Sequence, residues 1–361
     1  MKIAFTTILP GEGFVRLSGH ELYAPLEEAE VLVSTFDKPV TREMIQSAPK
    51  LKLVTNFGVG FNNIDLEACR ERGIRVTNTP QPVIEPTAEL AFALMHDVAR
   101  RTAEFDRKLR AGQAEPFGVM NNLSHSLYGK TLGIIGMGRI GQALARRALA
   151  AGMRIVYHNR RPLGDEAMRR LEVFGLNDNI YLKTTQTTSA RINFLGRQED
   201  EINDNIDNKK QQLSLASTSA SDKGDEINDN IRYVSKEELL KEADFVSLNL
   251  PYTPEVRHLI GAAELEMMKS SAYLINTARG AHVDEEALVE ALKAGEIAGA
   301  AMDVYEHEPK IHPELLKLDN VVLSPHTGTG TWEGRIAMCE NVCENILAYL
   351  QNNIAGMDIV L

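Results

Sequence analysis

Four polar side chains late in the 361-residue chain are placed where they could do chemistry together. Arg279 and His326 each follow a short apolar run typical of a β-strand, Asp303 ends another such run, and Glu308 follows closely after it. The carboxyl ends of parallel strands meet at one edge of a sheet, and ligands bind there. We therefore expect these four side chains to converge on one site.

The residue types indicate which chemistry such a site would support. A guanidinium such as Arg279 binds a carboxylate and a neighbouring carbonyl oxygen through its fork of donors. The imidazole of His326 titrates close to neutral pH and suits a general acid, and Glu308 could orient it and stabilise its charged form. Together with a hydride donor, these groups would reduce a keto acid. Taken singly, each also has a structural explanation: a surface arginine, a solvated loop glutamate or a structural histidine.

A glycine motif earlier in the chain predicts where the hydride donor binds. Gly136, Gly138 and Gly141 follow an apolar run at 131–135 and precede a helical pattern at 142–151. In this strand–turn–helix context the first glycine allows the tight turn, the second lets backbone approach a pyrophosphate, and the third lets helix and strand pack closely. The free N–H groups at the helix start would face the phosphates. The motif therefore predicts a dinucleotide site.

The end of the second strand indicates which dinucleotide is preferred. An acidic residue there would bind the ribose 2′-hydroxyl of NAD, whereas arginine suits the 2′-phosphate of NADP. The chain has Asn159, Arg160 and Arg161 at this point. Two guanidiniums can clamp a phosphate with paired charge-assisted bonds. NADP(H) is favoured and NAD(H) stays possible, since the arginines could instead form a solvated basic turn.

Composition excludes several classes of function. The net charge of -11 argues against nucleic-acid or anionic-membrane partners. No apolar run is long enough to span a membrane, and the N-terminus lacks a basic segment followed by an apolar one, so we expect a cytoplasmic protein. Cys69, Cys339 and Cys343 form no disulfide framework, and the last two are expected to be core thiols rather than metal ligands.

Strands alternate with helices along the chain, which predicts parallel sheets. The expected fold is α/β with two domains: a Rossmann doubly wound sheet (99–327) inserted into a smaller flavodoxin-like α/β domain (1–98 and 328–361). A glycine-containing loop at 56–63 follows a strand of the small domain, and its N–H groups could hold a carboxylate, although a plain turn is equally consistent.

Three segments outside the strands also carry expectations. Residues 86–110 read as one long amphipathic helix, and 332–351 as a helix that returns to the first domain. Residues 115–128 could form an arm used in oligomer contacts. The segment 174–231 is rich in Asn, Ser, Thr and Asp and contains Asp-Glu-Ile-Asn-Asp-Asn-Ile twice, which predicts a disordered insertion.

Four ordered motifs resemble the D-isomer-specific 2-hydroxyacid dehydrogenase family. They are Gly-Ile-Ile-Gly-Met-Gly-Arg-Ile-Gly (133–141), Asn-Thr-Ala-Arg-Gly (276–280), Met-Asp-Val-Tyr-Glu-His-Glu-Pro (302–309) and Ser-Pro-His-Thr-Gly (324–328). Residues 56–65 and 159–161 look most like the glyoxylate/hydroxypyruvate reductase branch. The family usually has Asp where this chain has Asn159, which counts against NAD as the preferred cofactor. The resemblance implies reduction of a small 2-keto acid to the D-2-hydroxy acid by an NAD(P)-dependent enzyme, and a homodimer formed through the cofactor domains.

The resemblance also implies roles for individual residues. Arg279 would bind substrate, His326 would be the acid/base and Glu308 its partner, while Gly58, Val59 and Gly60 would hold the substrate carboxylate. Asp303 would lie at the nicotinamide carboxamide. The remaining cofactor contacts implied are Gly136, Gly138, Arg139, Ile140, Gly141, Asn159, Arg160, Arg161, Pro251, Thr277, Ala278, Arg279, His326 and Gly328.

Two other functions are consistent with the same motifs. A 3-phosphoglycerate dehydrogenase would need an additional cationic pocket for its substrate's phosphate. A nucleotide-sensing corepressor of the same fold would bind the dinucleotide without turnover, although the presence of Arg279, Glu308 and His326 argues against it. The sequence gives no indication of a metal site.

Overall fold

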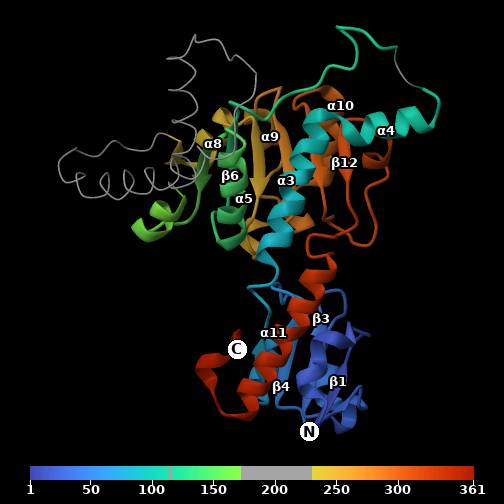
Figure 1. Cartoon of the computed structure of the whole chain (residues 1–361), viewed down its shortest axis with the longest axis vertical. Coiled ribbons are helices and arrows are strands. Elements are labelled where there is room, and N and C mark those ends of the chain that lie inside the picture. The colour runs from blue at the N-terminus through green and yellow to red at the C-terminus, as the bar shows by residue number, and fades with distance from the viewer. Residues whose placement is uncertain (114–115, 172–229) are drawn as a thin grey trace, which may run out of the picture.

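The computed structural model describes residues 1–113, 116–171 and 230–361, and it shows two α/β domains built on separate parallel sheets (Figure 1). The predicted fold class is confirmed. Two segments link the domains: the chain leading into helix α3 (Ile84–Arg100) and the chain leading into helix α11 (Trp332–Leu350).

The small sheet has five strands in the order β2-β1-β3-β4-β5, all parallel. This is the flavodoxin-like order, as predicted. Its strands are β1 (Lys2–Phe5), β2 (Glu21–Leu22), β3 (Val31–Thr35), β4 (Leu53–Phe57) and β5 (Arg75–Thr77). Helices α1 (Arg42–Ser47) and α2 (Leu66–Glu71) bury one face, and α11 with the 3₁₀ helix η1 (Gly11–Leu17) buries the other.

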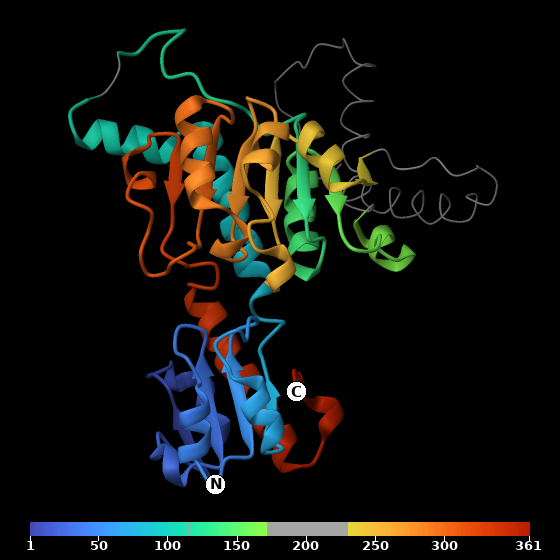
Figure 2. The ribbon, with the colours of Figure 1, turned by 180° about the vertical axis from the view of Figure 1, so that it is seen from behind.

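Helix α11 returns from the large domain to the small one, as expected from the sequence. It starts beside the large domain and runs along the small sheet, as Figures 1 and 2 show from opposite sides. Met338, Val342 and Ile346 recur every four residues on the buried face of the helix. Cys339 and Cys343 lie fully buried in the same core, and burial raises the pKa of each thiol to about 12. The prediction that they are core thiols is confirmed.

The large sheet has seven parallel strands in the order β12-β11-β10-β9-β6-β7-β8. Counted from β6, this is the Rossmann order with one further strand at the edge, and the order reverses between β6 and β9. Its strands are β6 (Thr131–Ile135), β7 (Arg154–His158), β8 (Ile231–Tyr233), β9 (Phe245–Leu248), β10 (Tyr273–Asn276), β11 (Gly299–Met302) and β12 (Val321–Leu323).

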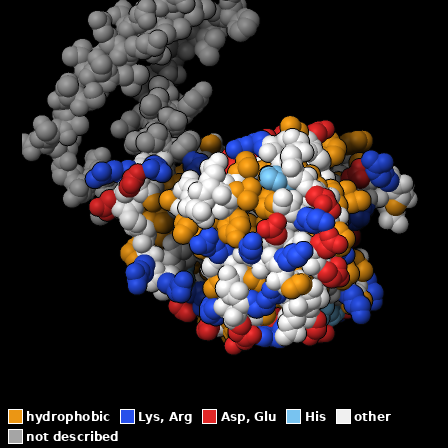
Figure 3. All heavy atoms as spheres, turned by 90° about the horizontal axis from the view of Figure 1, so that it is seen from below, with side chains coloured by type: hydrophobic (Ala, Val, Ile, Leu, Met, Phe, Trp, Pro, Cys, Tyr) orange, Lys and Arg blue, Asp and Glu red, His pale blue; other side chains and the backbone are white. Residues whose placement is uncertain are grey.

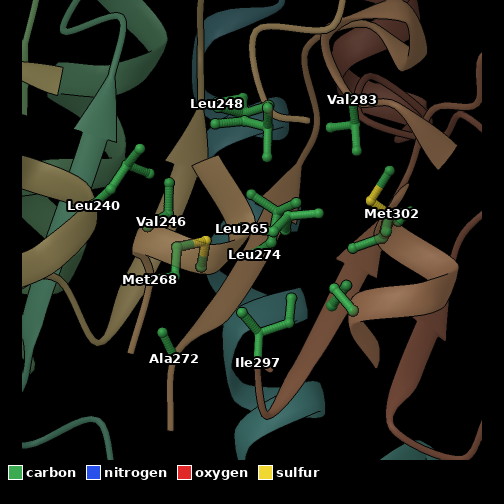
Figure 4. Close-up of a cluster of buried hydrophobic side chains, with 14 of the residues drawn as sticks. Leu240, Val246, Leu248, Leu265, Met268, Ala272, Leu274, Val283, Ile297 and Met302 are labelled. Carbon is green, nitrogen blue, oxygen red and sulfur yellow. The ribbon is translucent and has the colours of Figure 1, made fainter. Parts of the chain in front are cut away.

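Helices cover both faces of the large sheet. Helix α3 and helix α5 (Arg139–Ala150) pack on one face, with small residues such as Ala88, Ala91 and Ala145 at their contact. Helices α8 (Lys236–Glu242), α9 (Ala262–Met267) and α10 (Glu285–Ala294) pack on the other face. Figure 4 shows this second core, where Leu248, Leu265 and Leu274 meet between strands and helices. The two packed faces hold the strand ends rigidly at one edge.

The expected single helix over 86–110 is wrong. The chain forms α3 and then α4 (Thr102–Arg110), because Arg101 adopts a left-handed conformation with φ of 56° and ends the first helix. The Arg101 guanidinium donates two hydrogen bonds of 2.7 Å to the buried carboxylate of Glu104, which also accepts one from Lys108 at 2.6 Å. A local ion-pair cluster thus stabilises a bend that the helical periodicity does not reveal.

The predicted insertion at 174–231 lies outside the described residues except at its end. Ile231 is buried as the first residue of β8, paired with Ile155 of β7, so the sheet resumes earlier than the sequence suggested. We also propose that the domain boundary lies before α3 rather than at residue 98, because α3 packs on β10, β11 and α5 of the large domain.

Among the described residues, no helix is both long and apolar enough to cross a membrane. On the face shown in Figure 3, basic and acidic side chains are interspersed rather than gathered by sign.

Candidate active site

Arg279 lies in the turn that follows β10, and this turn is fixed by a neighbouring asparagine. The Asn276 side chain accepts a hydrogen bond from the N–H of Ala278 at 3.1 Å and donates one to the carbonyl of Arg279 at 2.9 Å. On its other side, Gly280 packs against the backbone of Tyr305 so closely that a Cβ would lie 1.9 Å from the Tyr305 carbonyl carbon. Only glycine fits at position 280, and the Arg279 backbone is therefore held in one conformation.

The Arg279 guanidinium contacts the glycine loop of the small domain. A Cβ at Gly60 would lie 1.7 Å from Arg279 Nη2, so the two domains meet here. Asn56 shapes the loop by donating to the Gly60 carbonyl at 2.6 Å. Among the described residues, the N–H groups of Val59 and Gly60 donate to no protein acceptor. Burial lowers the pKa of Arg279 and the negative charge of Glu308 opposes this, so the cation is desolvated and lacks a full counter-charge.

His326 follows β12 and is aimed by its backbone. Its φ of 53° is left-handed, and its N–H donates to the carbonyl of Asp303 at 2.8 Å. The ring nitrogen Nδ1 lies 2.8 Å from Glu308 Oε2. The opposite nitrogen, Nε2, therefore points away from Glu308, and the ring of Phe36 from the small domain lies 5.2 Å from the imidazole.

Glu308 is held by two hydrogen bonds. Besides the one with His326, it accepts from the N–H of Tyr305 at 3.0 Å. Burial would raise the pKa of Glu308, but these hydrogen bonds and the charges of His326 and Arg279 outweigh it, so the net shift is downward. Glu308 is therefore an anion at neutral pH and stabilises a positively charged His326.

Asp303 organises the loop that carries His326. It is fully buried at the end of β11, and its two carboxylate oxygens accept hydrogen bonds from the N–H groups of Thr327 at 2.7 Å and Gly328 at 2.9 Å. An ionised carboxylate has about four lone-pair positions, so Asp303 keeps capacity for a further donor. It also lines the cleft described below, which leaves that capacity accessible to a ligand.

The glycine motif forms the turn expected of a phosphate-binding loop. Gly136 has a φ of 97° and lies against the backbone of Asn249, and a Cβ at Gly141 would lie 2.5 Å from the Gly136 carbonyl oxygen. Gly138, which caps helix α5, faces open space: among the described residues, no neighbouring atom lies within 4 Å of where a Cβ would be. A pyrophosphate can therefore approach the backbone at Gly138 and the start of α5.

Two buried polar atoms next to this turn have no protein partner within the described ranges. Thr277 Oγ1 follows β10 and Asn249 Oδ1 follows β9, and both residues line the cleft. Unpaired buried polar atoms are costly unless a ligand or water satisfies them. Their position between the glycine turn and His326 fits the hydroxyl and amide groups of a nicotinamide dinucleotide, so the residues present fit that cofactor.

The segment after β7 has no acidic residue at its start. Asn159 uses its side-chain oxygen to accept from the N–H of Met137 at 2.7 Å and thus stabilises the glycine turn. Arg160 and Arg161 are exposed, and in the described part of the chain neither forms an ion pair within 4.0 Å. Arg160 acts electrostatically on Glu255, whose pKa is lowered by the Thr253 hydroxyl, by its own N–H and, more weakly, by this arginine.

These groups meet in a cleft of about 640 Å³, which is within the usual range for a ligand site. The predicted residues that line it are Gly58, Val59, Gly60, Gly138, Arg139, Ile140, Pro251, Thr277, Ala278, Arg279, Asp303, His326 and Gly328. Glu308 lies behind His326, Gly136 and Gly141 lie within the turn, and Asn159, Arg160 and Arg161 lie beyond the cleft wall.

Several residues that line the cleft are not among those predicted from the sequence. Phe36 follows β3, and Asn249 and Tyr252 follow β9, so the strand-end rule that found Arg279 could have found them too. Val83 and Thr87 come from the start of α3, and no pattern in the sequence marks them.

Comparison with known proteins assigns the family. Residues 92–194 and 195–328 match the NAD-binding domain of the D-isomer specific 2-hydroxyacid dehydrogenases. A glyoxylate reductase of Thermococcus litoralis is 40% identical over 337 residues, covering 92% of this chain and 84% of the relative. The chain belongs to the D-isomer-specific 2-hydroxyacid dehydrogenase family and is an NAD(P)-dependent oxidoreductase that interconverts 2-keto and 2-hydroxy acids.

Solved structures agree with this assignment. The TT0316 protein of Thermus thermophilus superposes with a TM-score of 0.77 at 36% identity over the whole of both chains. A D-lactate dehydrogenase of Aquifex aeolicus, complexed with NAD and lactic acid, has a TM-score of 0.73 at 26% identity and covers 99% of each chain. The family resemblance predicted from the four motifs is confirmed, and the corepressor hypothesis is set aside.

Proposed function

We propose that this protein uses NADPH to reduce glyoxylate to glycolate, or hydroxypyruvate to its D-2-hydroxy acid, D-glycerate. The observation that carries the proposal is the convergence of Arg279, the His326–Glu308 pair and the N–H groups of Val59 and Gly60 on one cleft. The glyoxylate reductase from Thermococcus litoralis supports the choice of a very small substrate.

In the proposed mechanism the substrate carboxylate lies between the small domain and Arg279. The N–H groups of Val59 and Gly60 donate to the carboxylate, and the desolvated Arg279 guanidinium binds the carboxylate and the keto oxygen. When bound, the nicotinamide cofactor supplies a hydride to the keto carbon. His326 donates the proton on Nε2 to the oxygen as its negative charge develops, and Glu308 stabilises the imidazolium from Nδ1.

The proposed preference for NADPH rests on the segment after β7. Asn159 carries no charge that would repel a 2′-phosphate, and Arg160 and Arg161 are exposed with their donors available. Both guanidiniums would clamp the phosphate, and Glu255 lies within electrostatic reach of Arg160.

We also propose that the protein is a homodimer formed through its large domain. In the segment after α4 the apolar side chains of Phe117 and Val119 are almost fully exposed, and that of Met120 is largely exposed. Such a group of exposed apolar residues is typical of an interaction surface. Phe117→Asp combined with Met120→Asp should convert a dimer into a monomer in light scattering after gel filtration.

A panel of keto acids measured with both cofactors tests the proposal. Purified protein is assayed at 340 nm with glyoxylate, hydroxypyruvate, pyruvate and 3-phosphohydroxypyruvate, each with NADPH and with NADH, and the product is resolved on a chiral column. We expect the highest kcat/KM for glyoxylate or hydroxypyruvate with NADPH, and a D product from hydroxypyruvate. Preference for the phosphorylated substrate would instead favour a 3-phosphoglycerate dehydrogenase.

A further inference from the structure

A second set of charged residues lies behind the loop that carries Glu308. The Glu306 carboxylate is only 10% exposed and faces the Arg257 guanidinium and the His258 imidazole, which follow the 3₁₀ helix η3 (Pro254–Val256). Its Oε1 accepts from Arg257 Nη2 at 2.6 Å and lies 2.7 Å from His258 Nε2. Glu306 does not line the cleft, so it takes no direct part in the mechanism described above.

The backbone of the same residue is also held. The N–H of Glu306 donates to Glu285 Oε1 at 2.7 Å, and Glu285 is buried at the start of α10. One residue earlier, the N–H of Tyr305 donates to Glu308, and the Tyr305 hydroxyl donates to the carbonyl of Ser324 at 2.8 Å. The turn from 305 to 308 is thus fixed at both its side-chain and its main-chain groups.

Glu308 is the last residue of this turn and is exposed to solvent. The conformation of the turn therefore determines whether its carboxylate reaches His326. The Glu306 carboxylate is nearly buried whereas the Arg257 side chain is about half exposed, so loss of the Glu306 charge would weaken the charge-assisted hydrogen bonds that hold this carboxylate in place. The turn would then sample other conformations, and the 2.8 Å contact between Glu308 and His326 would be populated less.

We propose that Glu306, clamped by Arg257 and His258, is a positioning residue that holds Glu308 against His326 and thereby sets the proton affinity of the catalytic imidazole. The inference rests on the proposed function, because it assigns His326 as the proton donor. In this proposal Arg257 and His258 act on His326 through Glu306, and none of the three residues lines the cleft.

Charged groups other than Arg257 and His258 also lie near the turn that contains Glu306 and Glu308. The test leaves all of them unchanged. Asp284 lies 3.5 Å from His258 Nδ1, and His307 and His312 act electrostatically on Glu285. On the cleft side, Arg279 acts on Glu308, and Asp303 acts on Tyr305 next to it. A change at Glu306 therefore alters one charge while the remaining electrostatic environment of His326 is kept.

The test compares Glu306→Gln with Glu308→Gln and with the double variant, using glyoxylate and NADPH. We expect Glu306→Gln to lower kcat about 10-fold, a fraction of the 10²–10⁴ attributed to a general acid, with a smaller change in KM. Reduction needs protonated His326, so a weaker Glu308 contact lowers its pKa. The alkaline limb of the kcat/KM profile should therefore move to lower pH by about 0.5 to 1 unit. In the Glu308→Gln background, Glu306→Gln should change kcat by less than about 2-fold.

Controls separate positioning from general loss of structure. Glu286→Gln removes a neighbouring carboxylate of α10 that pairs with His312 and is 80% exposed, and it should leave rate and pH profile unchanged. His258→Gln offers a second route to the same shift if Glu306→Gln does not fold, as judged by circular dichroism.

Two results would overturn the inference: an unmoved pH profile in folded Glu306→Gln, or an equal loss of rate in the presence and absence of Glu308. Unchanged turnover in Glu308→Gln and His326→Ala would instead overturn the proposed function itself, so the two failures are distinguishable.

Discussion

The two ends of the cleft are built in opposite ways. The chemical end contains Arg279, Glu308 and His326, and each of these residues has a partner that fixes its position. Asn276 holds the Arg279 turn, Asp303 holds the His326 loop, and Glu308 lies 2.8 Å from the imidazole. At the other end, Arg160 and Arg161 are exposed and form no ion pair within the described residues.

Under the proposed function, this difference follows from what each end would have to do. Hydride and proton transfer need reacting atoms within a few tenths of an ångström of their productive positions, which requires preorganised groups. Attraction of a dianionic phosphate needs only positive charge within reach, and flexible exposed side chains can provide it. The chemical end should therefore be intolerant of substitution, whereas the other end should change cofactor preference without loss of turnover.

The largest expected effect is at His326. His326→Ala removes the proposed proton donor, and kcat for glyoxylate reduction should fall by about 10²–10⁴. Steady-state kinetics with NADPH gives the rate, and fluorescence titration of NADPH checks that cofactor binding persists. A rate close to that of the unaltered protein would rule out the proton-donor role.

The next effect is expected at the other end of the cleft. Arg160→Asp puts a negative charge where a 2′-phosphate would bind, and charge-assisted hydrogen bonds are worth about 1.5–3 kcal/mol each. The ratio of kcat/KM for NADPH to that for NADH should thus fall by about 10- to 100-fold, while kcat with saturating NADH is kept. Arg169→Asp, a similar exposed charge reversal further along the chain, serves as the control. An unaltered ratio would contradict the NADPH assignment.

Ionic strength should affect the two ends unequally. Exposed charges are screened over about 8–10 Å at physiological salt and over less at higher salt, whereas buried charges are screened much less. Raising NaCl from low to high concentration should raise KM for NADPH several-fold and KM for glyoxylate by less. Equal increases in both KM values would show that Arg279 is as accessible to salt as Arg160.

The smallest effect is expected from removing the inserted segment. Asn230 directly precedes β8, whose first residue, Ile231, pairs with Ile155 near the start of β7, so the segment rejoins the sheet at the end opposite the strand ends that line the cleft. Deletion of 174–229 with a short glycine–serine linker should leave turnover and cofactor affinity within a few-fold. Failure to fold or loss of activity would show that the segment supports the large domain.

Much of the fold could be predicted from periodicity and spacing. The runs that became β6, β9, β10, β11 and β12 are short, apolar and followed by turn residues, and such local patterns are what strand propensity and burial produce. The glycine spacing at 136, 138 and 141 could also be interpreted from the sequence, because Gly136 and Gly141 meet steric demands of the turn and Gly138 leaves space for a phosphate to approach.

Features that depend on contacts between distant residues could not be read in this way. The bend at Arg101 arises from its ion pairs with Glu104 and from a left-handed backbone, and neither leaves a periodic trace. Similarly, Phe36 and Asn249 enter the cleft only because strands β3 and β9 end at the same place in space.

The sequence by itself determined which chemical groups this protein possesses and the order in which its strands deliver them, because local spacing encodes strands, turns and the glycine motif. Only the tertiary structure decided that Gly60 of one domain lies against Arg279 of the other, and that the Glu306 carboxylate meets Arg257 and His258. The physical reason is that such contacts join residues far apart in the chain, whose proximity depends on how both domains pack.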